Sequence, residues 1–172
     1  MSKPGRRSTP SARQLAVRTL PEIEQRQGFS NRLLSEQLER HLDLDPRDRA
    51  LATNLVYGVL RQQTRLDALI DAFAHKPKKI KGELRTILRV ATYEIVELER
   101  PLGIASAEAA KLAARLDPQG LLRGLIAGVL QGIDRDAAIL DVALQDGDPI
   151  DALERRWSLP RWLAGRWVAQ LG

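Results

Sequence analysis

The stretch DPRDRALATNLVYGVLR, residues 45–61, decides the fold. It opens with an aspartate suited to an N-cap at Asp45, a proline in the first turn, and the acidic Asp48 facing the positive end of the helix dipole. Leu51, Leu55 and Val59 follow at intervals of four residues, which places apolar side chains on one face of a helix. The stretch therefore predicts a helix with one buried side.

Apolar residues recur at helical spacing on both sides of this stretch. Strand signals are sparse, because aromatic residues make up 4% of the chain and no run alternates apolar and polar residues. The sequence therefore predicts an all-α fold, a compact helical bundle with a C-terminal helical extension. The first expected helix begins at Thr9 or Ser11 and ends near Gly28, and a second follows Ser30. Beyond the stretch quoted above, helices are expected over 66–73, 84–98, 105–116 and 121–133, with weaker helix over 135–156. Their apolar stripes include Ala12, Ala16, Leu20 and Ile23; Leu33, Leu34, Leu38 and Leu42; and Leu84, Ile87, Leu88, Ala91, Ile95 and Leu98.

Length and composition limit the class of protein. A chain of 172 residues suits one domain, or one domain with a tail. No run of about 18 uncharged apolar residues is present, and the start MSKPGRRSTPSARQ has no apolar segment, so neither a membrane span nor a secretory signal is predicted. We therefore expect a cytoplasmic protein without a membrane partner.

Residue types that carry catalysis are scarce. The chain has no cysteine, which excludes a nucleophilic thiolate, a disulfide and a cysteine-bound zinc. His41 and His75 lie far apart, and neither has another ligand at metal-binding spacing. No phosphate-binding loop follows a strand. The sequence therefore predicts no catalytic, cofactor-binding or metal-binding residue.

Glycines recur every four residues in GLLRGLIAGVLQG, at Gly120, Gly124, Gly128 and Gly132. This spacing puts them near one face of a helix. Because an interior glycine costs a helix roughly 1 kcal/mol relative to alanine, the spacing favours close approach by the backbone of another helix. A groove that binds a partner is the alternative.

Positive charge is concentrated in two stretches, within a net charge of +5. Such stretches commonly bind phosphates, although an exposed charged face or a solubilising tail is the alternative. No aromatic pair lies among these residues, so contact with a nucleic-acid backbone and its shape is favoured over stacking of unpaired bases. The residues that we predict to bind such a backbone are Arg6, Arg7, Arg13 and Arg18, which with Lys3 precede every acidic residue, and Lys76, Lys78, Lys79, Lys81, Arg85 and Arg89, which surround only Glu83.

The last segment, RRWSLPRWLAGRWVAQLG, holds all three tryptophans of the chain, Trp157, Trp162 and Trp167. Ser158 and Pro160 predict the start of a short helix. Such a helix is expected to pack on something. If the tail leads to a domain absent from this chain, its tryptophans should be exposed; if the chain is complete, they should be buried in its own core.

Residues 12–135 resemble the NusB-like helical domain. The matching strings, in chain order, are ARQLAVRTL, GFSNRLL, DPRDRALATNLVYGVLR, LDALI, the basic link KPKKIKG (residues 76–82), LRTILRVATYEI and GLIAGVLQGIDR. The resemblance implies two packed helical subbundles that bind structured RNA. It gives an expected organisation of a basic arm over 1–9, an RNA-binding domain over 10–135 and a helical extension over 136–172.

The tail segment Ser158-Leu-Pro-Arg-Trp-Leu resembles the Ser/His-x-Pro-x-Trp-Leu segment after this domain in the RsmB, or Sun-type, ribosomal RNA cytosine-C5 methyltransferases. Two positions depart from that group. Ala127-Gly-Val-Leu-Gln131 stands where an Asn-Gly/Ala-Val-Leu-Arg string is expected, and Gly103-Ile104 replaces a His-Ala step, whereas Glu108 is in place.

The resemblance implies the ribosomal RNA recognition part of such an enzyme. Methyl transfer to carbon five of cytosine needs a thiolate, so this cysteine-free chain is not expected to catalyse it, and S-adenosylmethionine is expected only in a downstream domain. The chain is then either a piece of a longer enzyme or a stand-alone relative. Two alternatives stay open: a free antitermination factor that pairs with a small-subunit ribosomal protein on leader RNA, and a helical protein-interaction module without RNA.

Overall fold

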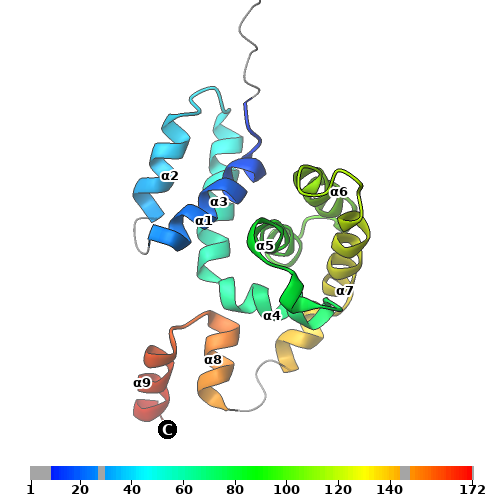
Figure 1. Ribbon diagram of the computed structural model, residues 1–172. Helices are drawn as coiled ribbons and strands as arrows, with labels where there is room; N and C mark the ends of the chain where they lie inside the picture. Colours follow the sequence, from blue (N-terminus) through cyan, green and yellow to red (C-terminus); the bar gives the residue numbers. More distant parts are fainter. Residues whose placement is uncertain (1–8, 27–29, 144–147, 172) are drawn as a thin grey trace, which may run out of the picture. The chain divides into compact units, whose positions relative to one another are not determined.

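The computed structural model describes residues 9–26, 30–143 and 148–171, and it is helical throughout them without a strand (Figure 1). The predicted all-α fold is confirmed. None of the helices in these residues is long and apolar enough to span a membrane. In chain order the elements are α1 (Ala12–Arg26), α2 (Ser30–Glu39), α3 (Pro46–Arg61), α4 (Gln63–Phe73), the 3₁₀ turn η1 (Pro77–Lys79), α5 (Gly82–Val96), α6 (Leu102–Ala113), α7 (Leu122–Ala143), α8 (Pro149–Trp157) and α9 (Arg161–Leu171).

The chain divides into two compact units, Met1–Val56 and Tyr57–Gly172, and the division falls within α3. In the first unit α1 packs against α2. Its hydrophobic cluster consists of buried residues from α1, the turn before α3, and α3, with two partly buried leucines packed on them: Ala12, Leu15, Leu44 and Ala52, then Leu38 and Leu51. Most of the expected apolar stripes are therefore buried.

Local sequence sets the helix starts of the first unit. Ser11 and Gln14 form a reciprocal capping box, in which the Gln14 amide donates to Ser11 Oγ at 3.2 Å and the Ser11 amide donates to Gln14 Oε1 at 2.9 Å. The predicted cap of α3 is confirmed, since the Asp48 amide donates to Asp45 Oδ1 at 2.9 Å. One core prediction was wrong: Leu42 is 78% exposed, because α2 ends at Glu39.

The second unit is built around α5, whose residues Thr86 to Ile95 are all buried. Helices α4, α6 and α7 pack against it (Figure 1). Gly58, in the motif at the end of α3, provides a close approach: a Cβ built on it would lie 2.1 Å from Cζ of the buried Tyr93. The absence of a side chain at Gly58 therefore leaves room for the ring of Tyr93.

Helix α7 is longer than the sequence indicated. It continues ten residues beyond the expected end at Ile133, to Ala143, so residues 135 and 136 lie within one helix. The expected boundary between domains at that point remains a prediction. After α7 the chain forms α8, where Asp148 is the N-cap and its Oδ1 accepts hydrogen bonds from the amides of Ile150 at 2.8 Å and Asp151 at 3.2 Å.

The four glycines of the repeat have different surroundings. Only Gly132 has a close contact, and the contact is with a side chain rather than with the backbone of another helix: a Cβ on it would lie 2.5 Å from Cδ1 of Phe73. Gly120 precedes α7 and has a φ of +76°, a left-handed conformation that glycine adopts without strain. A Cβ on Gly124 or Gly128 would meet nothing within 4 Å. The predicted close approach of another helix backbone was therefore wrong at Gly120, Gly124 and Gly128.

Candidate nucleic-acid interface

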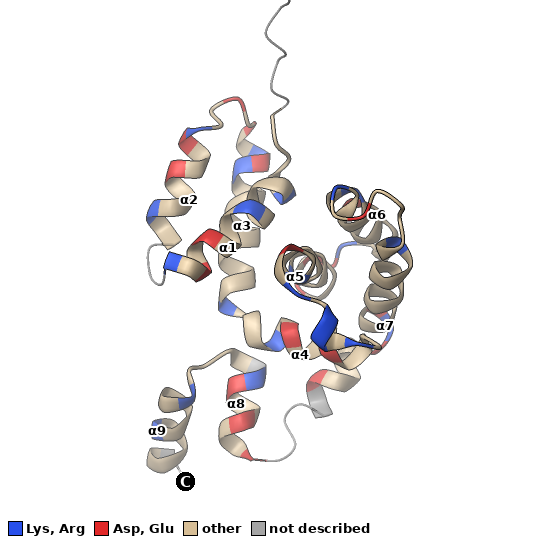
Figure 2. Cartoon of the chain, viewed as in Figure 1, with Lys and Arg blue, Asp and Glu red and all other residues tan. Residues whose placement is uncertain are grey.

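The link between α4 and α5 presents the predicted lysines to solvent. It is shaped by η1, with Pro77 at its first position, and by the Ile80 amide, which donates to the Pro77 carbonyl at 3.0 Å. Ile80 is buried and attaches the link to the helices. The four lysines of the link are exposed, and none is ion-paired with another residue that the structure describes: Lys76, Lys78, Lys79 and Lys81. Figure 2 shows Lys and Arg in blue on the segment between α4 and α5.

The two arginines of the second predicted basic stretch lie on α5, where they pair with carboxylates. Arg89 is buried and binds Asp67 through two hydrogen bonds, Nε to Oδ1 at 2.8 Å and Nη2 to Oδ2 at 2.7 Å. Arg85 donates to Asp71 Oδ1 at 2.6 Å. The middle of α5 is buried on all sides, and these two cations face the acids of α4. Their part in binding RNA stays a prediction.

Arg85 also positions the basic link. Its Nε donates to the Ile80 carbonyl at 3.1 Å and its Nη2 donates to the Pro77 carbonyl at 3.3 Å. These bonds hold the backbone on which the lysines are mounted. We therefore interpret Arg85 as a residue that positions the lysines by holding the backbone of the link.

The remaining predicted RNA-binding residues belong to the N-terminal part. Arg6 and Arg7 lie outside the described residues. Arg13 and Arg18 are on α1 in the first unit, where Arg18 is exposed and Arg13 is half-buried. Their role in binding RNA stays a prediction.

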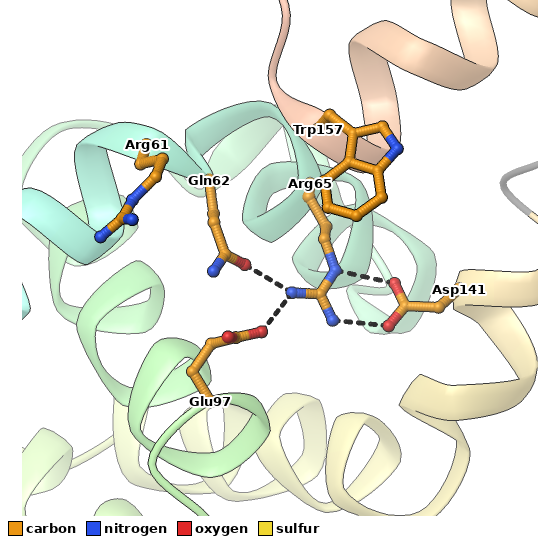
Figure 3. Close-up of a pocket in the computed structure, with 6 residues that line it drawn as sticks. All are labelled: Arg61, Gln62, Arg65, Glu97, Asp141 and Trp157. Carbon is orange, nitrogen blue, oxygen red and sulfur yellow. Dashed lines mark hydrogen bonds and ion pairs between the residues drawn. The ribbon is translucent and has the colours of Figure 1, made fainter.

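A second polar site, which sequence reasoning missed, surrounds Arg65 at the start of α4 (Figure 3). Its guanidinium binds both oxygens of Asp141, with Nε to Oδ1 at 2.9 Å and Nη2 to Oδ2 at 2.6 Å. Nη1 donates to Glu97 Oε1 at 2.6 Å and also to Gln62 Oε1. The bonds to Asp141 and Glu97 raise the pKa of Arg65 above its ordinary value, against the opposite effect of burial.

Arg65 contributes to a cavity of about 410 Å³ that Arg61 and Trp157 also line (Figure 3). Because its guanidinium is occupied by two carboxylates, this cavity is poorly suited to a phosphate. We interpret the site as a structural junction of α4 with the end of α5 and with α7. Its partners are 32 and 76 residues away in sequence, so no local spacing could have revealed them.

Ser158 has a different role from the one expected. It was predicted to start the last helix, but it ends α8 in a left-handed conformation, with a φ of 50°. Its hydroxyl oxygen accepts from the amide of Thr64 at 3.1 Å and, at 3.5 Å, from that of Arg65. These amides are in the first turn of α4, where the N-cap Gln62 supplies no side-chain bond. A serine of the tail thus caps a helix 94 residues earlier.

Ser158→Ala is expected to lower the free energy of unfolding by about 1 kcal/mol, because it removes this cap from α4. Ser158→Asn should retain most of the stability, since asparagine tolerates the left-handed conformation and supplies an acceptor oxygen. Urea unfolding checks both. Ser35→Ala, at an exposed position in α2, is the matched control, and a loss as large as that of Ser158→Ala would contradict the cap.

The tail helices pack within the second unit and leave their tryptophans in solvent. Helix α8 packs on α4, and α9 packs on α8. Ala164 of α9 is buried, and Arg161 pairs with Glu154 of α8 at 3.3 Å. The exposed fractions of the tryptophan side chains are large at all three positions: 59% at Trp157, 65% at Trp162 and 47% at Trp167. The sequence left two arrangements open, with the tryptophans either exposed or buried, and the structure has them exposed.

Metal chemistry finds no support in the described part of the chain, where no group of three His, Cys, Asp or Glu side chains is placed to hold an ion. His75 borders the basic link, and His41 lies in the turn after α2.

Comparison with known proteins gives a consistent family. A family model described as the NusB family matches residues 10–135. The chain is 32% identical over 163 residues to the probable ribosomal RNA small subunit methyltransferase B of Bacillus subtilis (strain 168), covering 94% of this chain and 36% of that protein. The protein of the same name from Synechocystis is 33% identical over 155 residues, covering 89% and 34%.

A putative methyltransferase of Mycobacterium tuberculosis is 30% identical over 174 residues, covering 98% of this chain and 38% of that protein. The chain therefore spans about a third of the length of the curated relatives it matches.

Proposed function

Because this chain belongs to the NusB family, we propose that it is the ribosomal RNA binding module of a small-subunit rRNA cytosine-C5 methyltransferase. The names of its relatives support this function over that of a free antitermination factor. Catalysis and S-adenosylmethionine binding belong, in this proposal, to a domain that this chain does not contain. The chain has no cysteine to supply the thiolate that the reaction needs.

The observation that carries the proposal is the basic link. Lys76, Lys78, Lys79 and Lys81 extend from a backbone that Ile80 and Arg85 hold in place. A lysine ammonium group is a flexible point charge that suits phosphate oxygens. Contacts of this kind fix the position of an RNA without reading its sequence. The module would thus hold folded ribosomal RNA while the attached enzyme selects its nucleotide.

The test is the salt dependence of binding to a structured fragment of small-subunit ribosomal RNA, measured by fluorescence anisotropy between 50 and 200 mM salt, roughly the range over which such effects are large. Replacing the four link lysines by glutamine should lower affinity about tenfold or more. It should also reduce the slope of log affinity against log salt by about 0.7 to 0.9 for each phosphate that the variant no longer neutralises. The protein should keep its stability, because exposed cations contribute little to folding.

A control with the same change in net charge replaces four cations of α6, the following turn and α7 by glutamine: Lys111, Arg115, Arg123 and Arg135. It should leave the slope nearly unchanged. A wild-type chain that fails to bind at low salt would rule out the RNA function. Retained binding with an unchanged slope in the link variant would instead place the contact on the N-terminal arm and the start of α1, at Arg6, Arg7 and Arg13.

A further inference from the structure

A cavity of about 510 Å³ lies beside the basic link, within the second unit. Its volume is in the range of sites that enclose small organic groups. The wall is formed by the end of α4, the residue after η1, the start of α5 and one face of α7. The apolar residues that line it are Phe73, Ile80, Leu84, Leu122, Leu125 and Val129.

Two glycines of α7 keep this cavity open. Gly124 and Gly128 line it, and a Cβ built on either would meet nothing within 4 Å. Packing within the described residues therefore gives no reason for glycine, although glycine weakens the helix at both positions. Their effect is to leave bare backbone at the cavity wall, where a flat group can approach closely.

The edge of the cavity is basic. Lys76 and Lys79 line it together with His75, and no acidic residue does. Both lysines are exposed and belong to the link that holds RNA in the proposed function. An apolar cavity with cations at its edge matches a nucleotide, which joins an apolar planar base to an anionic phosphate. An apolar protein side chain would make no use of these charges.

Phe73 supplies the aromatic surface that the sequence did not indicate beside the link. It lines the cavity, and its ring is held against α7, since Cγ lies 2.8 Å from the position of a Cβ on Gly132. An aromatic ring fixed in this way can stack on a base of any sequence. The sequence favoured contact with backbone and shape over stacking of unpaired bases, and a base stacked on Phe73 would depart from that expectation.

We propose that the cavity between the basic link and the Gly124–Gly128 face of α7 receives one unpaired base of the bound RNA, with Lys76 and Lys79 on its phosphate. This inference rests on the proposed function, because the RNA must first bind the link. The base would be held by apolar contact and stacking, and the phosphate by charge.

Nucleotide titration tests the cavity directly. The ¹⁵N-labelled chain is titrated with each of the four ribonucleoside 5′-monophosphates and, in parallel, with ribose 5-phosphate and inorganic phosphate. The amides of Gly124 and Gly128 should shift only with probes that carry a base, whereas those of Lys76 and Lys79 should shift with every probe. Equal shifts at the glycines with ribose 5-phosphate, or none with any nucleotide, would overturn the proposal.

Filling the cavity tests its use by RNA. Gly128→Leu should weaken binding of the ribosomal RNA fragment about tenfold, within the range measured for one stacked base, and should leave the salt slope unchanged because no cation is removed. Ala127→Leu is the matched control, since it adds the same side chain at an exposed neighbouring position. Melting curves should show neither variant to be less stable than the wild type.

The outcomes separate the two proposals. If the wild-type chain does not bind the RNA fragment, the proposed function fails. If it binds and both leucine variants bind equally well, only the base-binding cavity fails. That second result, together with unperturbed glycine amides, would favour a protein side chain as the occupant.

Discussion

Replacing Gly58 by leucine is expected to destabilise the protein by about 4 kcal/mol, at the upper end of what overpacking a core costs. The position of a Cβ on Gly58 lies 2.1 Å from Cζ and 2.3 Å from the hydroxyl oxygen of Tyr93, whose side chain is buried. The ring must move, and α5 around it is closely packed. Gly58→Ala should cost about 2 kcal/mol, because overpacking exceeds the gain of roughly 1 kcal/mol in helix propensity.

Urea unfolding with a double-mutant cycle checks this prediction. Tyr93→Ala should remove most of the penalty of Gly58→Ala, because it removes the ring that the new methyl group meets. Gly103→Ala is the matched control, since a Cβ at Gly103 in α6 meets nothing within 4 Å. It should be neutral or stabilising by up to about 1 kcal/mol. A Gly58→Ala penalty that persists in the Tyr93→Ala background would refute the steric explanation.

Arg65→Met is expected to lower the free energy of unfolding by about 2 to 3 kcal/mol, below the loss for a fully buried pair because the site is partly solvated. The side chain is 14% exposed, and methionine keeps its apolar length while removing the bonds to Asp141 and Glu97. The two carboxylates then remain in a low-dielectric site without that cation. Arg65→Lys should recover only part of the loss, because an ammonium group cannot bind both oxygens of Asp141 in parallel.

Chemical denaturation of these variants should be compared with Arg135→Met. Arg135 pairs with Asp136 at 2.6 Å, but its side chain is 71% exposed, so its loss should change stability by less than about 0.5 kcal/mol. Equal losses for Arg65→Met and Arg135→Met would show that the junction at Arg65 contributes no more than a surface pair.

Local patterns in the sequence were sufficient for the helices and for several of their ends. The cap at Asp45 depends on residues within one turn, and the apolar stripe of α5 repeats with the period of the helix itself. Interactions of this range can be predicted because the backbone fixes which residues are neighbours. The 3.6-residue period therefore indicated both the fold class and most of the core.

Charge and glycine patterns were less informative, because their meaning depends on what faces them. Lysines and arginines near the link look alike in sequence, yet Arg89 binds Asp67 in the interior while Lys79 stays exposed. Gly128 and Gly132 share a helical spacing, but one faces a cavity and the other Phe73. Only the packing of distant segments distinguishes these cases.

The capping of α4 by Ser158 makes this helix a spacer of defined length. Its first turn is joined to the tail, and its last residue leads into the lysine link. Eleven residues at 1.5 Å each give about 16 Å between these two ends. A rigid rod of this kind does not stretch as a flexible tether would. Any group carried on α8 and α9 would therefore stand at a fixed reach from an RNA phosphate bound at the link.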